Sequence, residues 1–183
     1  MRKSFFYSAI ALLVPVFFIF SAFTNSPKPN EGINWVSIEE AEALAAKDGK
    51  NILVDVYTDW CGWCKRMDKS TYENQKVINY INENFHAVKF DAEQKGDVTL
   101  KGRTFKFVAQ GRRGYHELAA GILQGKMSYP STVFLNSQFE ILTDIKGFRG
   151  PDEMMGFLTY FKDELYKEEI SLQKYLDDYK SSN

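Results

Sequence analysis

The feature that most constrains the fold is a nearly continuous apolar run over residues 51–57, in which Asp55 is the one charged member. Runs of this kind are typical of strands that are buried on both faces of a parallel sheet. Apolar residues at helical spacing follow over 77–85, and 86–91 is predicted as another short strand. The order strand, helix, strand predicts a β-α-β unit with a right-handed crossover, and hence an α/β fold.

A short amphipathic helix is predicted before this unit. Ser37 and Glu40 form a capping box at its start, and Gly49 closes it. Its apolar stripe consists of Ile38, Ala41, Leu44 and Ala45. The domain is therefore expected to begin with a helix that packs on the sheet.

The C-terminal part of the chain predicts a hairpin and a helix. Segments 132–135 and 139–145 flank a polar turn, which is typical of two antiparallel strands. A helix is predicted to begin at Pro151. Its apolar stripe consists of Met154, Met155, Leu158, Phe161 and Leu165. Such a stripe is more typical of a packed core than of a cofactor site.

A long segment, about 95–127, separates the second strand from this hairpin. The elements predicted within it are a hairpin of 98–100 and 104–108, an irregular stretch over 111–114 and a helix over about 116–123. The hairpin and Arg112-Arg113 are candidates for shaping partner choice, but a solvated loop is the ordinary interpretation of the two arginines, and we assign them no function.

The N-terminus has the pattern of an export signal. Arg2 and Lys3 precede an apolar run that begins at Phe5. Two outcomes stay open: cleavage of residues 1–26 as a signal peptide, or retention of an anchor over about 5–23. Pro15 and the phenylalanine-rich run favour cleavage. Residues 27–34 are interpreted as a linker, and 35–183 as the folded domain.

The charge pattern restricts the class of partner. The chain has 23 basic and 24 acidic residues, and they are interspersed. No basic surface for nucleic acid is therefore expected. We expect partners to be recognised by local shape, outside the cytoplasm.

The only two cysteines lie in one motif, Cys61-Gly62-Trp63-Cys64, directly after the first strand. A thiol attacks a disulfide as its thiolate, and the unpaired N–H groups at a helix start stabilise a negative sulfur. Cys61 is therefore the expected nucleophile. Cys64, one turn later, is within disulfide distance, and we expect it to be the resolving and more buried thiol.

Two further interpretations concern this motif. The cysteines could be half of a zinc site, but zinc takes four ligands and only His86 and His116 remain as soft partners. We therefore expect no metal and no cofactor. Asp55 could be a satisfied acid at a strand end, but its offset from the motif favours a proton acceptor for Cys64, with a pKa raised by burial.

The motif resembles the active-site segment of the thioredoxin superfamily. The resemblance rests on residues 53–65 and on Tyr129-Pro130-Ser131-Thr132, which is similar to the cis-proline loop of that family. It covers about residues 35–166, and it implies a thioredoxin fold: a central mixed sheet flanked by helices, here with an insertion before the cis-proline strand. Extracytoplasmic thioredoxin-like reductases are the nearer likeness.

The resemblance also implies roles for individual residues. Trp60, Gly62 and Trp63 would flank the reactive sulfurs, Pro130 would be cis and pack beside them, and the backbone of Tyr129 would pair with a substrate polypeptide. Without the resemblance, a trans Pro130 and tryptophans that serve only for packing would be the ordinary expectation. Less firmly, Lys89 matches a lysine that faces the buried acid.

We therefore predict a protein-disulfide oxidoreductase that exchanges a Cys61–Cys64 dithiol with protein disulfides and is recharged by a redox partner. It is expected in the periplasm or secreted, or held at the inner membrane if residues 5–23 are retained. A reductase is favoured. A disulfide oxidase or isomerase, and a non-catalytic binding or chaperone module, stay open as alternatives, because Gly62-Trp63 replaces the usual Gly-Pro of thioredoxin.

Overall fold

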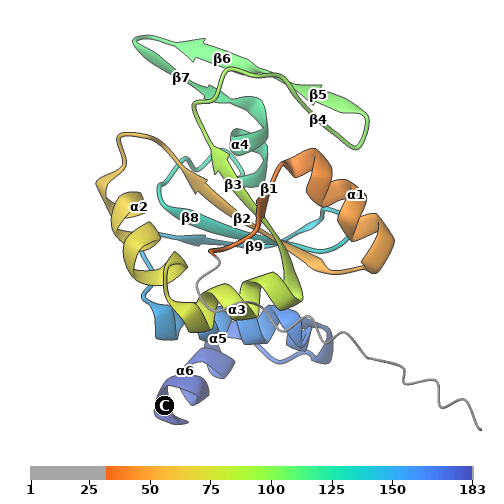
Figure 1. Ribbon diagram of the computed structural model, residues 1–183, viewed down its shortest axis with the longest axis vertical. Helices are drawn as coiled ribbons and strands as arrows, with labels where there is room; N and C mark the ends of the chain where they lie inside the picture. Colours follow the sequence, from red (N-terminus) through yellow and green to blue (C-terminus); the bar gives the residue numbers. More distant parts are fainter. Residues whose placement is uncertain (1–31, 183) are drawn as a thin grey trace, which may run out of the picture.

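A five-stranded mixed sheet runs through the centre of the computed structural model, which describes residues 32–182 (Figure 1). Its strands are β1 (Trp35–Val36), β2 (Asn51–Tyr57), β3 (Phe85–Asp91), β8 (Ser131–Leu135) and β9 (Ile141–Lys146). The order is β1-β3-β2-β8-β9. β1, β3 and β2 are parallel, whereas β8 and β9 join the sheet by antiparallel pairing. The predicted mixed sheet, with its C-terminal hairpin, is confirmed.

Helices cover both faces of this sheet, as predicted (Figure 1). One face is covered by α1 (Ile38–Asp48) and α4 (Glu117–Ile122), and the other by α3 (Gln75–Asn84) and α5 (Pro151–Lys162). Alternate side chains of β2 point to opposite faces. Ile52 and Val54 pack with α1 and α4, whereas Leu53 packs with α3 and α5. Asp55 has the same parity as Leu53, so it faces the side of α3 and α5.

The ends of α1 follow their sequence signals. The Ser37 side chain accepts a hydrogen bond from the backbone N–H of Glu40 at 3.1 Å. Gly49 ends the helix in the left-handed conformation, with φ 76°, and its N–H donates to Ala45 O. These contacts satisfy backbone groups that a helix end leaves unpaired, which confirms the predicted start and stop.

The segment after the cysteine motif is more broken than its periodicity predicts. It consists of α2 (Gly62–Met67), the π-helix η1 (Asp68–Tyr72) and then α3. The Asn74 side chain caps α3 by accepting hydrogen bonds from the backbone of Lys76 at 3.0 Å and Val77 at 3.4 Å. The local cap restarts the helix, and Phe85 begins β3 instead of ending α3.

The segment before β8 contains two hairpins: the one predicted at 98–100 is confirmed, but its second strand ends at Phe105 instead of 108, and the second hairpin was not predicted. The strands are β4 (Val98–Leu100), β5 (Arg103–Phe105), β6 (Phe107–Gln110) and β7 (Arg113–His116). Lys106 separates β5 from β6 because its backbone pairs elsewhere. Its N–H donates to the Glu117 carboxylate at 2.8 Å, and its carbonyl accepts from the Glu117 N–H at 2.9 Å. The stretch over 111–114, predicted as irregular, holds the second turn and the start of β7.

The β4–β5 hairpin is attached to the exposed acidic side of α1. The backbone N–H of Thr99 donates to the Glu39 carboxylate at 3.2 Å. The backbone N–H of Lys101 donates to the Glu42 carboxylate at 3.0 Å. Two side chains of a surface helix therefore hold two backbone groups of the insertion.

The C-terminal region differs from its prediction at one end. α5 begins at Pro151 as expected but ends at Lys162, and Leu165 belongs to the 3-10 helix η2 (Leu165–Glu168). An unpredicted helix, α6 (Leu172–Ser182), packs on α5 at Gly156, where an added Cβ would lie 3.1 Å from Leu176. The small residue permits this close approach.

The predicted signal or anchor, residues 1–26, and most of the linker over 27–34 lie outside the described residues. Within residues 32–182, no helix has the length and apolar character that a membrane crossing requires. Whether the N-terminal run is cleaved or retained stays a prediction.

Candidate active site

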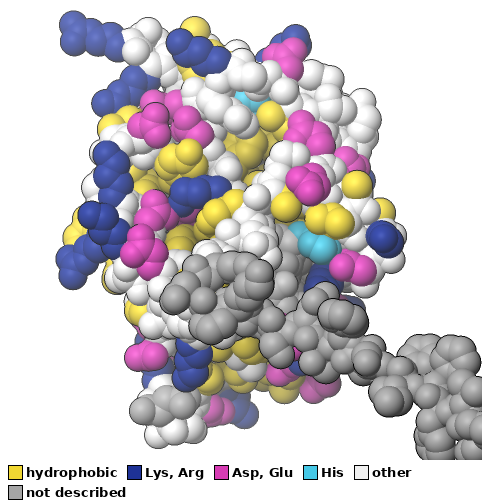
Figure 2. Space-filling view, in the orientation of Figure 1, with side chains coloured by type: hydrophobic (Ala, Val, Ile, Leu, Met, Phe, Trp, Pro, Cys, Tyr) yellow, Lys and Arg dark blue, Asp and Glu magenta, His cyan; other side chains and the backbone are white. Residues whose placement is uncertain are grey.

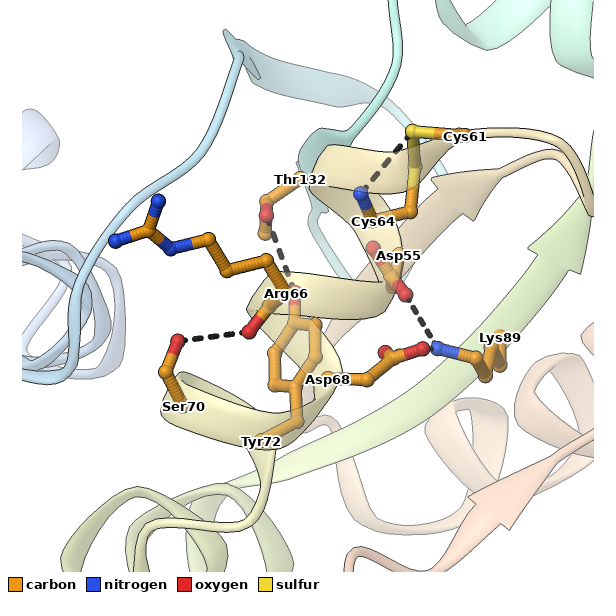
Figure 3. Close-up of polar contacts among 9 residues, drawn as sticks. All are labelled: Asp55, Cys61, Cys64, Arg66, Asp68, Ser70, Tyr72, Lys89 and Thr132. Carbon is orange, nitrogen blue, oxygen red and sulfur yellow. Dashed lines mark hydrogen bonds and ion pairs between the residues drawn. A yellow bond between two sulfur atoms is a disulfide. The ribbon is translucent and has the colours of Figure 1, made fainter.

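The two cysteines lie where β2 ends and α2 begins. Cys61 is the N-cap of α2, and its Sγ accepts a hydrogen bond from the backbone N–H of Cys64 at 3.1 Å. The two sulfurs are joined in a disulfide (Figure 3). Both residues are buried, Cys61 at 5% and Cys64 at 3% exposure, so the expected contrast in burial is small. The backbone N–H therefore points at the sulfur that the sequence identifies as the nucleophile.

A row of polar side chains crosses the sheet beneath this turn. The strand register aligns Asp55 with Lys89 on β3 and with Thr132 on β8. Lys89 Nζ lies 2.8 Å from Asp55 Oδ2, and Asp55 lies between Cys64 and Lys89 in the view of Figure 3. The register of two neighbouring strands thus brings an acid and its partner lysine under the motif.

Burial raises the pKa of Asp55 to about 6, against the opposing effect of the nearby Lys89 ammonium. The side chain is 2% exposed. Desolvation disfavours the carboxylate more than the lysine favours it, so the group can both hold and release a proton near neutral pH. This arrangement suits an acceptor for the proton of a buried thiol.

Lys89 has a second acidic partner that sequence reasoning missed. Its Nζ lies 2.5 Å from Asp68 Oδ1, at the start of η1. The rings of Tyr57, Trp35 and Tyr72 also surround the ammonium, with centroids at 4.9, 5.3 and 5.7 Å. Cation–π contacts and two carboxylates together favour its charged form. Only the break between α2 and α3 brings Asp68 here, so no local pattern could have indicated it.

Trp60 is exposed beside the disulfide, at 52%, and has three neighbours. Its Nε1 donates to Glu93 Oε1 at 3.0 Å, and its ring meets that of Tyr129 edge to face at 6.0 Å. The Arg113 guanidinium lies over the ring, 4.3 Å from its centroid. Arg113 is solvent-exposed as expected, but it belongs to β7 and contacts Trp60, so the interpretation as a loop residue is wrong.

Trp63 is exposed on the other side of the motif, at 56%. Its ring packs on Phe148 at 5.7 Å, and the Arg66 guanidinium lies 5.1 Å from its centroid. A shallow hollow of about 220 Å³ is lined by Gly62, Trp63 and Arg66. In Figure 2, basic side chains line the left edge of the molecule, past α2 and up to the hairpins, with acidic ones among them. The rim of the motif is aromatic and charged.

The loop before β8 lies against the motif through Trp60. The Tyr129–Pro130 peptide bond is cis, as the resemblance implies. The Pro130 carbonyl accepts a hydrogen bond from the Gly147 N–H at 2.8 Å. Burial, followed by the nearby Glu93 and Asp91 carboxylates, raises the pKa of Tyr129 to about 12. Its hydroxyl is therefore neutral at physiological pH.

The two histidines weighed as zinc ligands lie elsewhere. His116 is buried at the start of α4, where one ring nitrogen contacts Gly96 O and the other accepts from the Leu118 N–H. His86 contacts Asp48. Among the described residues, no three His, Cys, Asp or Glu side chains cluster in a way that could hold a metal ion.

Comparisons with known proteins place this site in a family. The model of a family described as "Protein of unknown function, DUF255", and named Thioredox_DsbH, matches residues 21–162. An uncharacterised protein of Caenorhabditis elegans is 29% identical over 132 residues, which are 72% of this chain and 16% of that protein. The thiol:disulfide interchange protein DsbD of Actinobacillus pleuropneumoniae is 44% identical over 45 residues, which are 25% of this chain and 8% of that protein.

A solved structure titled "DsbH Oxidoreductase" is similar in fold, with a TM-score of 0.51 and 17% identity. The match covers 87% of this chain and 95% of that structure. The chain spans less than a fifth of the length of the two curated relatives above, since the matches cover 16% and 8% of them. The family match covers most of the domain, including the motif and the cis-proline loop. The chain therefore belongs to the Thioredox_DsbH family, within the thioredoxin superfamily, and has the thioredoxin fold.

Proposed function

We propose that this protein is an extracytoplasmic thiol–disulfide oxidoreductase that acts as a reductase of protein disulfides. The observation that carries the proposal is the Cys61–Cys64 disulfide at the start of α2, with the Cys64 N–H directed at Cys61 Sγ. A sulfur that accepts a backbone hydrogen bond there is stabilised as a thiolate, which is the form that attacks disulfides. The similarity of 45 residues of this chain to a thiol:disulfide interchange protein supports the same reaction.

The reaction begins from the reduced dithiol. The Cys61 thiolate attacks one sulfur of a substrate disulfide, a Cys61–substrate disulfide forms, and the other substrate sulfur leaves as a thiolate that takes up a proton. Cys64 then gives its proton to Asp55 and attacks Cys61 Sγ. The Cys61–Cys64 disulfide forms, and the second substrate sulfur leaves. Two electrons pass from the protein to the substrate, and a separate dithiol donor must restore the protein.

The surroundings of the motif supply the other roles. Asp55 is the proposed proton acceptor because it is buried on the strand that leads into the motif and has a pKa of about 6. The proposed substrate surface consists of Trp60, Gly62, Trp63, Tyr129 and Pro130. The exposed rings of Trp60 and Trp63 suit apolar side chains of a polypeptide, and the loop at Pro130 offers backbone groups for pairing.

Trapping of the intermediate tests the reaction. A Cys64→Ser variant lacks the resolving thiol, so it should accumulate a covalent adduct with a disulfide-bonded polypeptide that is visible on a non-reducing gel. Cys61→Ser is the matched control and should form none. Asp55→Ala should slow the second step in the wild-type motif. The absence of any adduct with Cys64→Ser would instead indicate a non-catalytic binding module.

Equilibration with glutathione tests the direction. A reductase should have a potential of about −270 mV, an isomerase one of about −180 mV and an oxidase one above about −150 mV. Quantifying the Cys61–Cys64 dithiol by alkylation across a series of glutathione ratios gives the value. A potential above about −150 mV would overturn the assignment as a reductase but would remain consistent with thiol–disulfide exchange.

A further inference from the structure

The insertion before β8 reaches the motif through one side chain, Arg113. The hairpins lie together at one end of the molecule, beyond α1 and α4 (Figure 1). Arg113 is the first residue of β7, and its guanidinium lies 4.3 Å from the centre of the Trp60 ring. It also lies 3.9 Å from the Glu93 carboxylate, which accepts the indole N–H of the same tryptophan. Arg113 and Glu93 therefore hold the same aromatic ring.

The backbone of β7 fixes where Arg113 can point. The other end of the strand is anchored because the His116 N–H donates to Ala92 O at 2.7 Å, next to Glu93. The partner strand β6 packs tightly at Gly114, where a Cβ would lie 2.3 Å from Phe107 Cζ. A strand held at its far end and in close contact with its partner presents Arg113 in a set direction, toward the motif.

We propose that Arg113 is a positioning residue that sets the orientation of Trp60, so that the β6–β7 hairpin forms one wall of the surface that binds a disulfide-bonded polypeptide. This inference rests on the proposed function. Trp60 is half exposed, and its other neighbour is Tyr129, beside the cis-proline loop. A polypeptide that lies along this loop to reach Cys61 must contact the Trp60 ring. A small disulfide reaches the sulfur without that contact.

A cation–π contact is suited to holding the Trp60 ring in one orientation. A guanidinium stacked on an indole is attracted by the electron-rich face of the ring and covers it without removing the ring from solvent. The exposed part of the ring remains for a substrate side chain. The insertion therefore selects for polypeptides over small disulfides by holding an aromatic surface in place, and it need not contact the reacting sulfurs.

Single-turnover kinetics with the full chain in its pre-reduced form test this inference. The rate constants for insulin, a disulfide-bonded polypeptide, and for bis(2-hydroxyethyl) disulfide, a small neutral one, are compared for the wild type, Arg113→Ala and Arg113→Lys. For Arg113→Ala, the ratio of the insulin constant to the small-disulfide constant should fall about two- to fivefold, the range expected for one exposed cation–π contact. Arg113→Lys keeps the charge without the planar stack and should recover part of this loss.

Arg112→Ala is the matched control, because Arg112 is the exposed neighbour in the same turn and makes no hydrogen bond, ion pair or ring contact within residues 32–182. It should leave both constants unchanged. The indole N–H resonance of Trp60, assigned with Trp60→Phe, should shift in Arg113→Ala and stay in place in Arg112→Ala. If Arg113→Ala and Arg112→Ala changed the ratio of rate constants and the Trp60 indole resonance to the same extent, the role of Arg113 would be overturned. A wild type that reacts with neither substrate would overturn the proposed function itself.

Discussion

Replacing Asp55 with asparagine should change how the stability of the protein depends on pH. Asp55 is 2% exposed, and burial raises its pKa from 3.8 to about 6 in the folded protein. The unfolded chain exposes the carboxyl, which then has its ordinary pKa. The folded protein therefore holds this proton more tightly than the unfolded chain does.

The sign and size of the effect follow from this difference. As pH rises, the unfolded chain releases the proton first, so ionisation of Asp55 lowers the free energy of unfolding between about pH 4 and pH 6. A shift of about two units corresponds to roughly 3 kcal/mol, fully expressed above the folded pKa. An asparagine side chain does not ionise, so the variant should lack this loss. The free energy of unfolding of Asp55→Asn minus that of the wild type should therefore be higher at about pH 7.5 than at about pH 3.5, by roughly 3 kcal/mol.

Urea unfolding of the disulfide-bonded protein at these two pH values measures the quantity. Effects of the substitution that do not depend on pH, such as altered packing around the side chain, cancel when the two differences are compared. Asp59→Asn is the control, because it removes an exposed carboxyl from the loop between β2 and α2. A difference in the free energy of unfolding between wild type and Asp55→Asn that is the same at both pH values would refute the reasoning.

Two further substitutions have defined outcomes. Lys89→Met removes the cation 2.8 Å from the buried Asp55 carboxylate, which should then take up a proton at neutral pH. Because the pKa of Asp55 is about 6 with Lys89 present, this uptake costs about 1.4 kcal/mol at about pH 7, so urea unfolding should show a loss of up to this size that shrinks as pH falls; an equal loss at all pH values would contradict this. Gly114→Ala places a Cβ 2.3 Å from Phe107, which should open the β6–β7 hairpin. Amide hydrogen exchange should then accelerate over 107–116 and not in β2; protection as in the wild type would show that the hairpin tolerates the methyl group.

The parts of the fold that the sequence predicts correctly have local causes. The cap at Ser37, the left-handed Gly49 and the apolar run of β2 each depend on neighbours within a few residues. The second hairpin was missed because Lys106 pairs with Glu117, which lies beyond the next hairpin. No pattern within a strand-length window indicates that the ladder ends there.

The residues of the candidate site also fall into those with a local sequence signal and those without one. The Cys61–Cys64 disulfide could be predicted because the motif is continuous in sequence, and the buried Asp55 because it interrupts an apolar run. Asp68 and Arg113 were missed or dismissed, since each becomes part of the site only through the π-helix or through β7. No periodic sequence pattern indicates which way such a polar residue points. Its neighbours can therefore be known only from the folded chain.

The acidic side of α1 has a consequence for how this protein tolerates change. Glu39 is exposed and Glu42 is half-buried, and their exchange for another polar residue would ordinarily be close to neutral, yet they accept backbone hydrogen bonds from Thr99 and Lys101. A two-stranded hairpin is marginally stable alone. Lysine at either glutamate would remove the acceptor of one backbone N–H and weaken the attachment of the hairpin to the helix. These two carboxylates are thus needed for the folded structure of the hairpin, although they lie at the surface.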